Sequence, residues 1–145
     1  MDLPSVVMHV LITMSLLCNL SLVPVLPPWE PSEADIAYIS RTIWGETRGC
    51  PEIEQRAQGW NILNRVDDSQ FPDTIERVVT APNQFQGYSI NNPVEPFYEM
   101  ARDILIKWHN GEHEIPTDMF WCHGDGKHQR FRNQYYVTEE TKFYP

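Results

Sequence analysis

The stretch WGETRG at residues 44–49 holds a carboxylate whose position suggests chemistry. Glu46 follows Ile43 by three residues and Ile39 by seven, which places it on the apolar stripe of the helix predicted before Gly49. A carboxylate on such a face loses solvation, and the negative end of the helix dipole acts in the same direction, so the protonated form is favoured. A general acid needs that form, and we predict this role for Glu46. The alternative is a helix-end carboxylate that pairs with Arg48 or turns to water.

A protonated carboxyl of this kind suits the cleavage of a glycosidic bond, because the leaving oxygen must receive a proton. A hydrolase usually adds a second carboxylate for a water molecule or as a nucleophile. The remaining candidates stand in turn and cap positions, with no motif that would direct them toward Glu46. They are Asp67, Asp68, Asp73, Asp118 and Asp125.

Two later stretches supply candidate substrate-binding residues. Gln84, Phe85 and Tyr88 lie in the turn-rich loop at residues 80–93, and loops on a rigid scaffold often carry binding groups. An amide, a ring and a phenol suit an N-acetyl sugar, although Phe85 is equally suited to core packing. Trp121 and His123 alternate along a predicted strand, so they share one face, which is either the core or the cleft side.

The histidines of the last third raise the alternative of a metal site. His109 and His113 are four residues apart, but Gly111 lies between them and ends the predicted helix before the pair can align. His123 and His128 complete the group, and there is no H-E-x-x-H motif. We therefore predict neither a metal nor another cofactor.

Capping and periodicity predict four helices that position these residues. Ser32, with Asp35 three residues later, opens the first, which Gly49 ends. Pro51 starts the second, which ends near Val66. Its predicted buried face comprises Ile53, Ala57, Trp60 and Leu63. Gly45 and Gly59 lie inside these two helices, at a cost of about 1 kcal/mol each relative to alanine, so close backbone approach is expected at both.

The third helix is short and the fourth is long. Asp73 is predicted to cap the third helix, and Glu76 completes its capping box. The fourth runs from about Pro96 to Asn110, with Gly111 as its stop. Its predicted inward residues are Phe97, Ala101, Ile104, Leu105 and Trp108.

The final segment predicts a small β element. The stretches DMFWCH and QYYVT are expected to form short strands joined by the GDGK turn. The sequence therefore predicts an α+β domain that is mostly α.

A hydrophobic N-terminal segment precedes the domain. Residues 5–26 are almost continuously apolar, with a length suited to a membrane span or a secretory leader. Asp2, with no Lys or Arg before the apolar run, is atypical of a signal peptide, and a buried core helix is the alternative. Prolines at 24, 27 and 28 then break the chain. We predict a signal peptide or signal anchor over residues 1–28 and an exported domain over residues 29–145.

Composition limits the partners. The 145 residues suit one domain, and a net charge of −9 argues against nucleic acid, whose phosphates require a basic surface. The three cysteines are widely spaced and form no C-x-x-C pair. Cys18 lies in the leader, which leaves a Cys50–Cys122 disulfide or two thiols as the alternatives.

Four linked motifs give the chain a family resemblance. WGETRG, GWNILNRV, FPDTIERVV and NQF follow one another over residues 36–88 in an order and spacing that resemble the SleB-type cell wall hydrolases, the spore-cortex lytic enzymes. Thr47 replaces the alanine usual in the first motif. The stretch PTDMFWCH resembles the family's closing segment in altered form.

The resemblance implies a lysozyme-like fold and cleavage of the glycan strand of peptidoglycan. Glu46 falls on the family's catalytic glutamate. Family members are similar to lytic transglycosylases, in which one acid protonates the glycosidic oxygen and then takes the proton of the attacking C6 hydroxyl. The expected partners are peptidoglycan and, through the N-terminal segment, a membrane.

Two other functions stay open at this point: a metal-dependent cell wall peptidase and a non-catalytic peptidoglycan-binding module. The expected location is the periplasm or cell envelope, membrane-anchored or secreted. For a phage-encoded protein it would be the virion.

Overall fold

The computed structural model describes residues 27–123, 136–137 and 142–144. Most of the predicted leader, the GDGK turn, Asp125 and His128 therefore lie outside the described residues. The prediction of a mostly helical domain is confirmed, with four α-helices and one 3-10 turn in the described part. None of the described helices combines the length and apolar character that crossing a bilayer requires.

The first described helix, α2 (Glu33–Thr47), begins as its capping motif predicts. The Ser32 hydroxyl accepts a hydrogen bond from the Asp35 amide at 3.1 Å, which satisfies one of the unpaired donors of the first turn. The predicted stripe is fully buried, since Ile36, Ile39 and Ile43 are at most 1% exposed. This stripe fixes the rotation of α2 about its axis.

Helix α3 (Glu52–Asp67) is the central element of the fold. Every residue from Ala57 to Arg65 is buried, so α3 is covered on all sides over this stretch. The predicted single buried face is wrong at Ile53, which is 54% exposed. The prediction assumed one buried face along the whole helix. Because the middle of α3 is buried on all sides, the buried positions there do not indicate which face of the first turn is buried.

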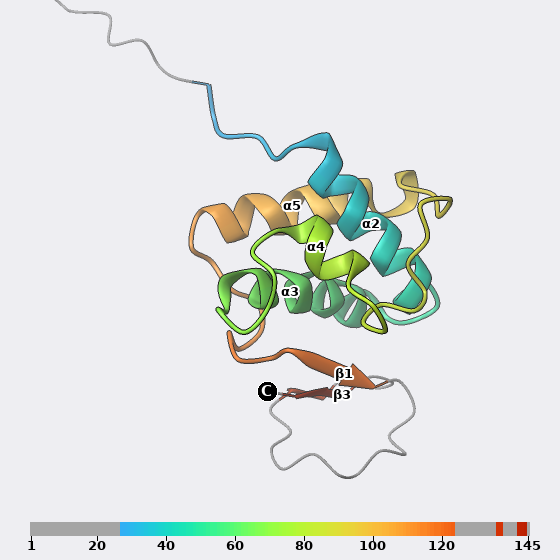
Figure 1. The fold of residues 1–145 in the computed structure, drawn as a ribbon. Helices are drawn as coiled ribbons and strands as arrows, with labels where there is room; N and C mark the ends of the chain where they lie inside the picture. Colours follow the sequence, from blue (N-terminus) through green and yellow to red (C-terminus); the bar gives the residue numbers. More distant parts are fainter. Residues whose placement is uncertain (1–26, 124–135, 138–141, 145) are drawn as a thin grey trace, which may run out of the picture.

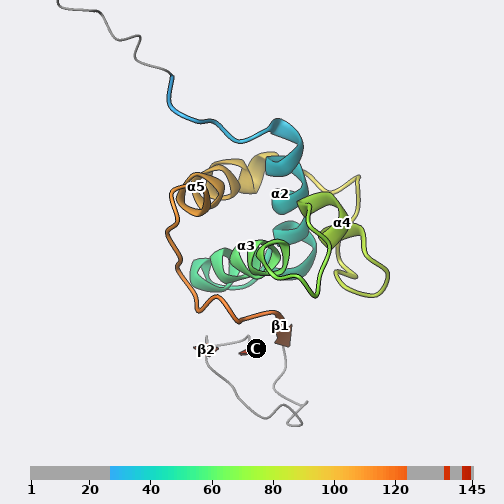
Figure 2. The same ribbon diagram turned by 60° about the vertical axis from the view of Figure 1, so that its left-hand side comes forward.

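The next two helices complete the bundle (Figures 1 and 2). In α4 (Ile75–Thr80) the cap is Thr74, whose hydroxyl accepts from the Arg77 amide. The prediction that Asp73 caps this helix is wrong, because the helix begins one residue later and Asp73 instead forms an ion pair with Arg77. The turn η1 (Glu95–Phe97) leads into α5 (Tyr98–His109). Gly111, at φ +77°, follows the end of α5 as expected.

Glycine permits close packing at both predicted positions, but in different ways. A Cβ on Gly59 would lie 2.8 Å from the Ile104 side chain, so this glycine brings α3 against α5. At Gly45 the neighbour is backbone, which matters for the site described below.

Three short strands follow the bundle. They are β1 (Trp121–His123), β2 (Tyr136–Val137) and β3 (Lys142–Tyr144), in the order β1-β3-β2 with both pairs antiparallel, and β1 and β3 are seen below α3 in Figure 1. Strands thus lie in both stretches where they were predicted. These two strands do not pair with each other directly, because β3 lies between them.

The segment before β1 is bound to α3 through main-chain carbonyls. Asn61 and Asn64 both donate to the Met119 carbonyl at 3.1 Å, and Asn64 also donates to that of Pro116. Arg65 donates through Nε and Nη2 to the Phe120 carbonyl. Buried polar side chains of the central helix therefore hold the chain as it leaves the bundle.

Candidate active site

Glu46 lies in the last turn of α2, and its side chain is exposed. The expectation that it shares the apolar face is wrong. The buried stripe continues through Thr47, four residues after Ile43, and Thr47 is only 4% exposed. Glu46, three residues after Ile43, stands on the flank of that stripe. The apolar core therefore does not enclose the Glu46 side chain.

The Glu46 carboxylate is held by a backbone amide from a distant loop. Gly87 N donates to Glu46 Oε1 at 2.6 Å, a short and charge-assisted hydrogen bond. Oε2 accepts no hydrogen bond within the described residues. One oxygen is thus held by the loop and the other has no hydrogen bond among the described residues. The alternative pairing with Arg48 does not occur, since Arg48 donates to the Trp44 carbonyl.

Two glycines allow this contact. An added Cβ on Gly45 would lie 1.9 Å from the Gly87 carbonyl oxygen, and one on Gly87 would lie 2.3 Å from the Gly45 oxygen. No side chain fits in either place. The prediction of close backbone approach at Gly45 is confirmed, and it brings the loop amide within reach of the neighbouring Glu46.

Asn92 fastens the same loop to α2. Its side-chain amide donates to the Arg41 carbonyl at 3.0 Å and to the Gly87 carbonyl at 2.9 Å. The Arg41 guanidinium donates back to the Asn92 carbonyl at 3.2 Å. We call Gly45, Gly87, Asn92 and the Arg41 backbone the clasp.

Gln84 and Phe85 have partners inside the protein. The Gln84 side-chain oxygen accepts from Arg65 Nη1 at 3.0 Å, and the Arg65 guanidinium carbon lies 4.8 Å from the centre of the Phe85 ring. Phe85 is 8% exposed, in accord with the core-packing alternative. Gln84 also lines a 260 Å³ hollow with Arg65, Gln70, Phe71, Pro72, Val78 and Ala81.

Tyr88 is half-buried one residue after Gly87, and its ring centre lies 6.1 Å from that of Tyr38. Burial raises the pKa of the Tyr88 phenol. A hydrogen bond with Glu76 of α4 raises the pKa of Tyr38. Both phenols are therefore neutral donors at physiological pH, beside the loop that holds Glu46.

The other two predicted binding residues lie on β1. The backbone register pairs Trp121 with Tyr144 and His123 with Lys142. Their side chains, and that of Cys122, lie outside the described part of the structure. Whether they reach the substrate stays a prediction.

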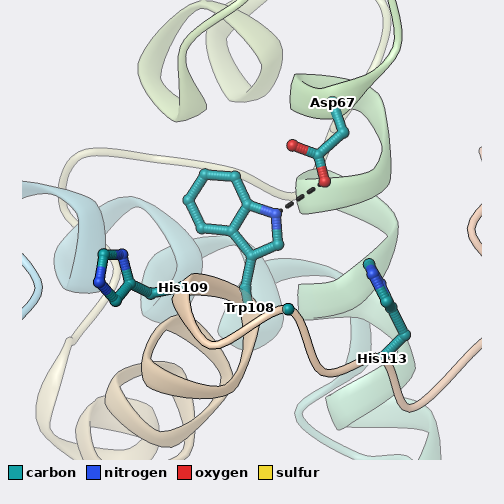
Figure 3. A pocket seen from close by; sticks show the side chains of 5 residues that line it. Asp67, Trp108, His109 and His113 are labelled. Atoms are coloured by element: carbon teal, nitrogen blue, oxygen red, sulfur yellow. Dashed lines mark hydrogen bonds between the residues drawn. The ribbon is translucent and has the colours of Figure 1, made fainter.

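A larger hollow, of 360 Å³, lies near the C-terminal ends of α3 and α5 and is not lined by Glu46 (Figure 3). Trp108 crosses it and donates its indole N–H to Asp67 at 2.8 Å. His109 lies to one side of Trp108 and His113 to the other. Among the residues that the structure describes, no group of three metal-ligating side chains is present.

An ion network of α3, α5 and the following segment lies near this hollow. Arg56 contacts Asp103 at 2.5 Å and Glu114 at 2.6 Å, and Lys107 bridges the same two acids. Trp60 donates its indole N–H to Glu114. The hydrogen bond from Arg56 is the main cause that lowers the pKa of Glu114 to about 2.

Comparisons with known proteins give one consistent family. A family model described as Cell Wall Hydrolase matches residues 49–144. The chain is 39% identical to the spore cortex-lytic enzyme of Bacillus cereus over 81 residues, covering 53% of this chain and 31% of that protein. It is 39% identical to that of Oceanobacillus iheyensis over 85 residues, covering 58% and 30%. The chain thus spans about a third of the length of these relatives.

Two solved structures are similar over most of the chain. The catalytic domain of the Bacillus cereus SleB protein matches with a TM-score of 0.63 and 26% identity, covering 82% of this chain and 94% of that one. The catalytic domain of a germination-specific lytic transglycosylase, SleB of Bacillus anthracis, matches with a TM-score of 0.65 and 25% identity, covering 82% and 100%. The resemblance seen in the four motifs is confirmed.

Proposed function

The chain belongs to the cell wall hydrolase family, and from that premise we propose that it cleaves the glycan strand of peptidoglycan with Glu46 as its single catalytic acid. The family match begins three residues after Glu46, so the assignment of this residue depends on its motif and geometry. The observation that carries it is the Glu46 carboxylate itself, which belongs to an exposed residue and is held on one oxygen by the Gly87 amide.

The proposed reaction is that of a lytic transglycosylase, the activity named for the similar structure from Bacillus anthracis. The glycosidic C–O bond breaks, and its electron pair goes to the leaving oxygen, which takes the proton of Glu46. The sugar whose C1 has lost the leaving oxygen then uses its own C6 hydroxyl oxygen to form a bond to that C1, and the hydroxyl proton passes to the Glu46 carboxylate. No water is consumed, and the carboxyl returns to its starting state.

The same proposal gives the loop a part in binding. Tyr88, half-buried beside Tyr38, offers a neutral phenol next to the clasp. Gln84 and Phe85 support the loop indirectly, because both contact Arg65 of α3. Trp121 and His123 would complete the cleft from β1.

The test is digestion of purified peptidoglycan by the wild-type protein and by Glu46→Gln, followed by mass spectrometry of the soluble products. A transglycosylase yields 1,6-anhydro ends, which are one water lighter than the reducing ends a muramidase yields. Release of peptides that needs a metal and stops in EDTA would instead indicate the peptidase. Binding without soluble products would indicate a non-catalytic module.

We also propose that residues 1–28 export residues 29–145 to the cell envelope, as a cleaved leader or as a membrane anchor. The apolar run at residues 5–26 and the prolines after it support this. A fusion of residues 1–28 to a reporter that is active only in the periplasm tests it. A reporter retained in the cytoplasm would contradict export.

A further inference from the structure

We propose that Asn92 is a positioning residue for Glu46, which it serves by holding the Gly87 amide on Oε1, so that Oε2 carries the transferable proton. The proposal rests on the proposed function. It extends that function from the acid to the loop that orients it.

The apolar contact of the loop from Gly87 to Pro93 with α2 comes from half-buried Tyr88, whose ring lies beside that of Tyr38. None of its residues is buried, and Ile90 at its tip is 61% exposed. This partial apolar contact is non-directional, so it does not by itself specify which loop atoms face α2. The hydrogen bonds do so.

Asn92 supplies those bonds at the point where the two backbones meet. A single side-chain amide donates to one carbonyl on α2, that of Arg41, and to one on the loop, that of Gly87. The carbonyl that it holds belongs to Gly87, the same residue whose N–H, in the preceding peptide unit, reaches Glu46. The backbone N–H of Asn92 donates to the Ser89 carbonyl at 3.0 Å. This bond closes a turn and fixes the position of the Asn92 Cα, from which the side chain extends.

The direction of the Gly87 bond determines which oxygen reacts. A backbone N–H can only donate, so the oxygen it contacts must accept. In a protonated carboxyl the carbonyl oxygen is the better acceptor, and the proton therefore resides on the other oxygen, Oε2. A shift of the loop would release Oε1, allow the carboxyl to rotate and spread the proton over both oxygens.

The experiment compares Asn92→Ala and Asn92→Asp with the matched changes at the exposed neighbour Asn91, in the full chain on solubilised glycan fragments. Misplacement of a reacting group by about 1 Å can cost about 10²-fold in rate. We therefore expect kcat to fall about 10- to 100-fold in the Asn92 variants, with KM within about threefold of wild type. Asn91→Ala and Asn91→Asp should match the wild type.

The Gly87 amide proton provides a readout that a general loss of stability would not move. In nitrogen–proton correlation spectra it should resonate downfield in the wild type and move upfield both in Glu46→Ala and in Asn92→Ala, with most other peaks unchanged. Should Asn92→Ala fail to fold, Asn92→Asp, which preserves shape and removes the donor, carries the test.

The outcomes separate this inference from the function on which it rests. Lysis by Glu46→Gln at the wild-type rate would remove the proposed function. Loss of lysis in Glu46→Gln with full activity in both Asn92 variants would overturn the positioning role alone. A Gly87 resonance that does not respond to Glu46→Ala would overturn it as well.

Discussion

The two ends of α3 are built in opposite ways. Near its first turn, α2 and the loop at residues 80–93 meet through two glycines, a backbone amide and one asparagine side chain. Its last turn lines the larger hollow through Asp67, and a network of four charged side chains links Arg56, in the first half of the helix, to α5 and to Glu114. The second region has the more obvious chemistry, with two histidines, a tryptophan and a carboxylate. The WGETRG motif, which contains Glu46, lies in the first region.

The difference shows what each kind of contact does. Long charged side chains tolerate small movements of the elements they join, because their flexible stems can follow those movements. Backbone contact through glycine leaves no such tolerance, because a single added methyl group would overlap the opposite chain. The proposed catalytic carboxyl of Glu46 must be placed within a fraction of an ångström. Backbone contact through glycine suits that requirement better than contact through long charged side chains.

The strongest test of the comparison exchanges one carboxylate at each end. Glu46→Gln keeps the shape and removes the proton, so lysis of peptidoglycan should fall about 10²- to 10⁴-fold. Asp67→Asn at the other end should retain most activity, as should Asp73→Asn, Asp118→Asn and Asp125→Asn. An equally deep loss in one folded Asp variant would point to a two-carboxylate hydrolase.

A methyl group tests the glycine contact. Gly45→Ala must push the loop away from α2, so we expect a loss of about 1–3 kcal/mol in unfolding free energy, typical of overpacking, together with a loss of lysis. Gly49→Ala is the matched control, because nothing lies within 4 Å of its added Cβ. It should leave stability unchanged or slightly raised. Equal effects of the two changes in denaturant melts would contradict the clasp.

The ion network predicts a defined acid dependence. The pKa of Glu114 is lowered from 4.5 to about 2, chiefly by Arg56. The ionised Glu114 carboxylate therefore makes its full contribution to the unfolding free energy above about pH 4.5, and this contribution is lost as the pH falls toward 2. Glu114→Gln should lower the unfolding free energy by about 1–3 kcal/mol at pH 7, the range typical of a hydrogen bond to a charged group. The difference in unfolding free energy between the variant and the wild type should shrink as the pH is lowered. Glu112→Gln is the control, and a gap that stays constant down to pH 2 would exclude this origin.

The smallest effect is expected at the larger hollow. Trp108→Phe removes the indole N–H that Asp67 accepts, a bond between partly exposed groups. We expect about 0.5–1.5 kcal/mol in unfolding free energy and unchanged lysis. A tenfold loss of lysis with a normal melt would give this hollow a functional role and overturn the division between the two ends.

Local features could be predicted from the sequence. The cap at Ser32 and the Ile36–Ile39–Ile43 stripe both depend on neighbours within a few turns. The errors at Ile53 and Asp73 are local as well: the first assumed one buried face on an enclosed helix, and the second chose between two adjacent capping residues.

One of the two arguments for Glu46 is wrong. The burial argument fails, because a position three residues after Ile43 lies beside the stripe rather than on it, and the proposal depends on the motif and on the contact with Gly87. Gly87 and Asn92 were missed because their partners are 41 and 51 residues away in the sequence. The glycine inside a helix at position 45 was the one available signal, and it did not identify its partner.

The carbonyl contacts of Asn61, Asn64 and Arg65 have a consequence for natural variation. These side chains bind the main chain of residues 116–120, which every amino acid provides. The exposed Thr117 and Asp118 can therefore drift in evolution without altering the path of the chain, provided Ile115 and Met119 stay apolar. The three polar residues of α3 have no such freedom. Homologues should thus differ freely in this connecting segment while the helix beneath it changes slowly.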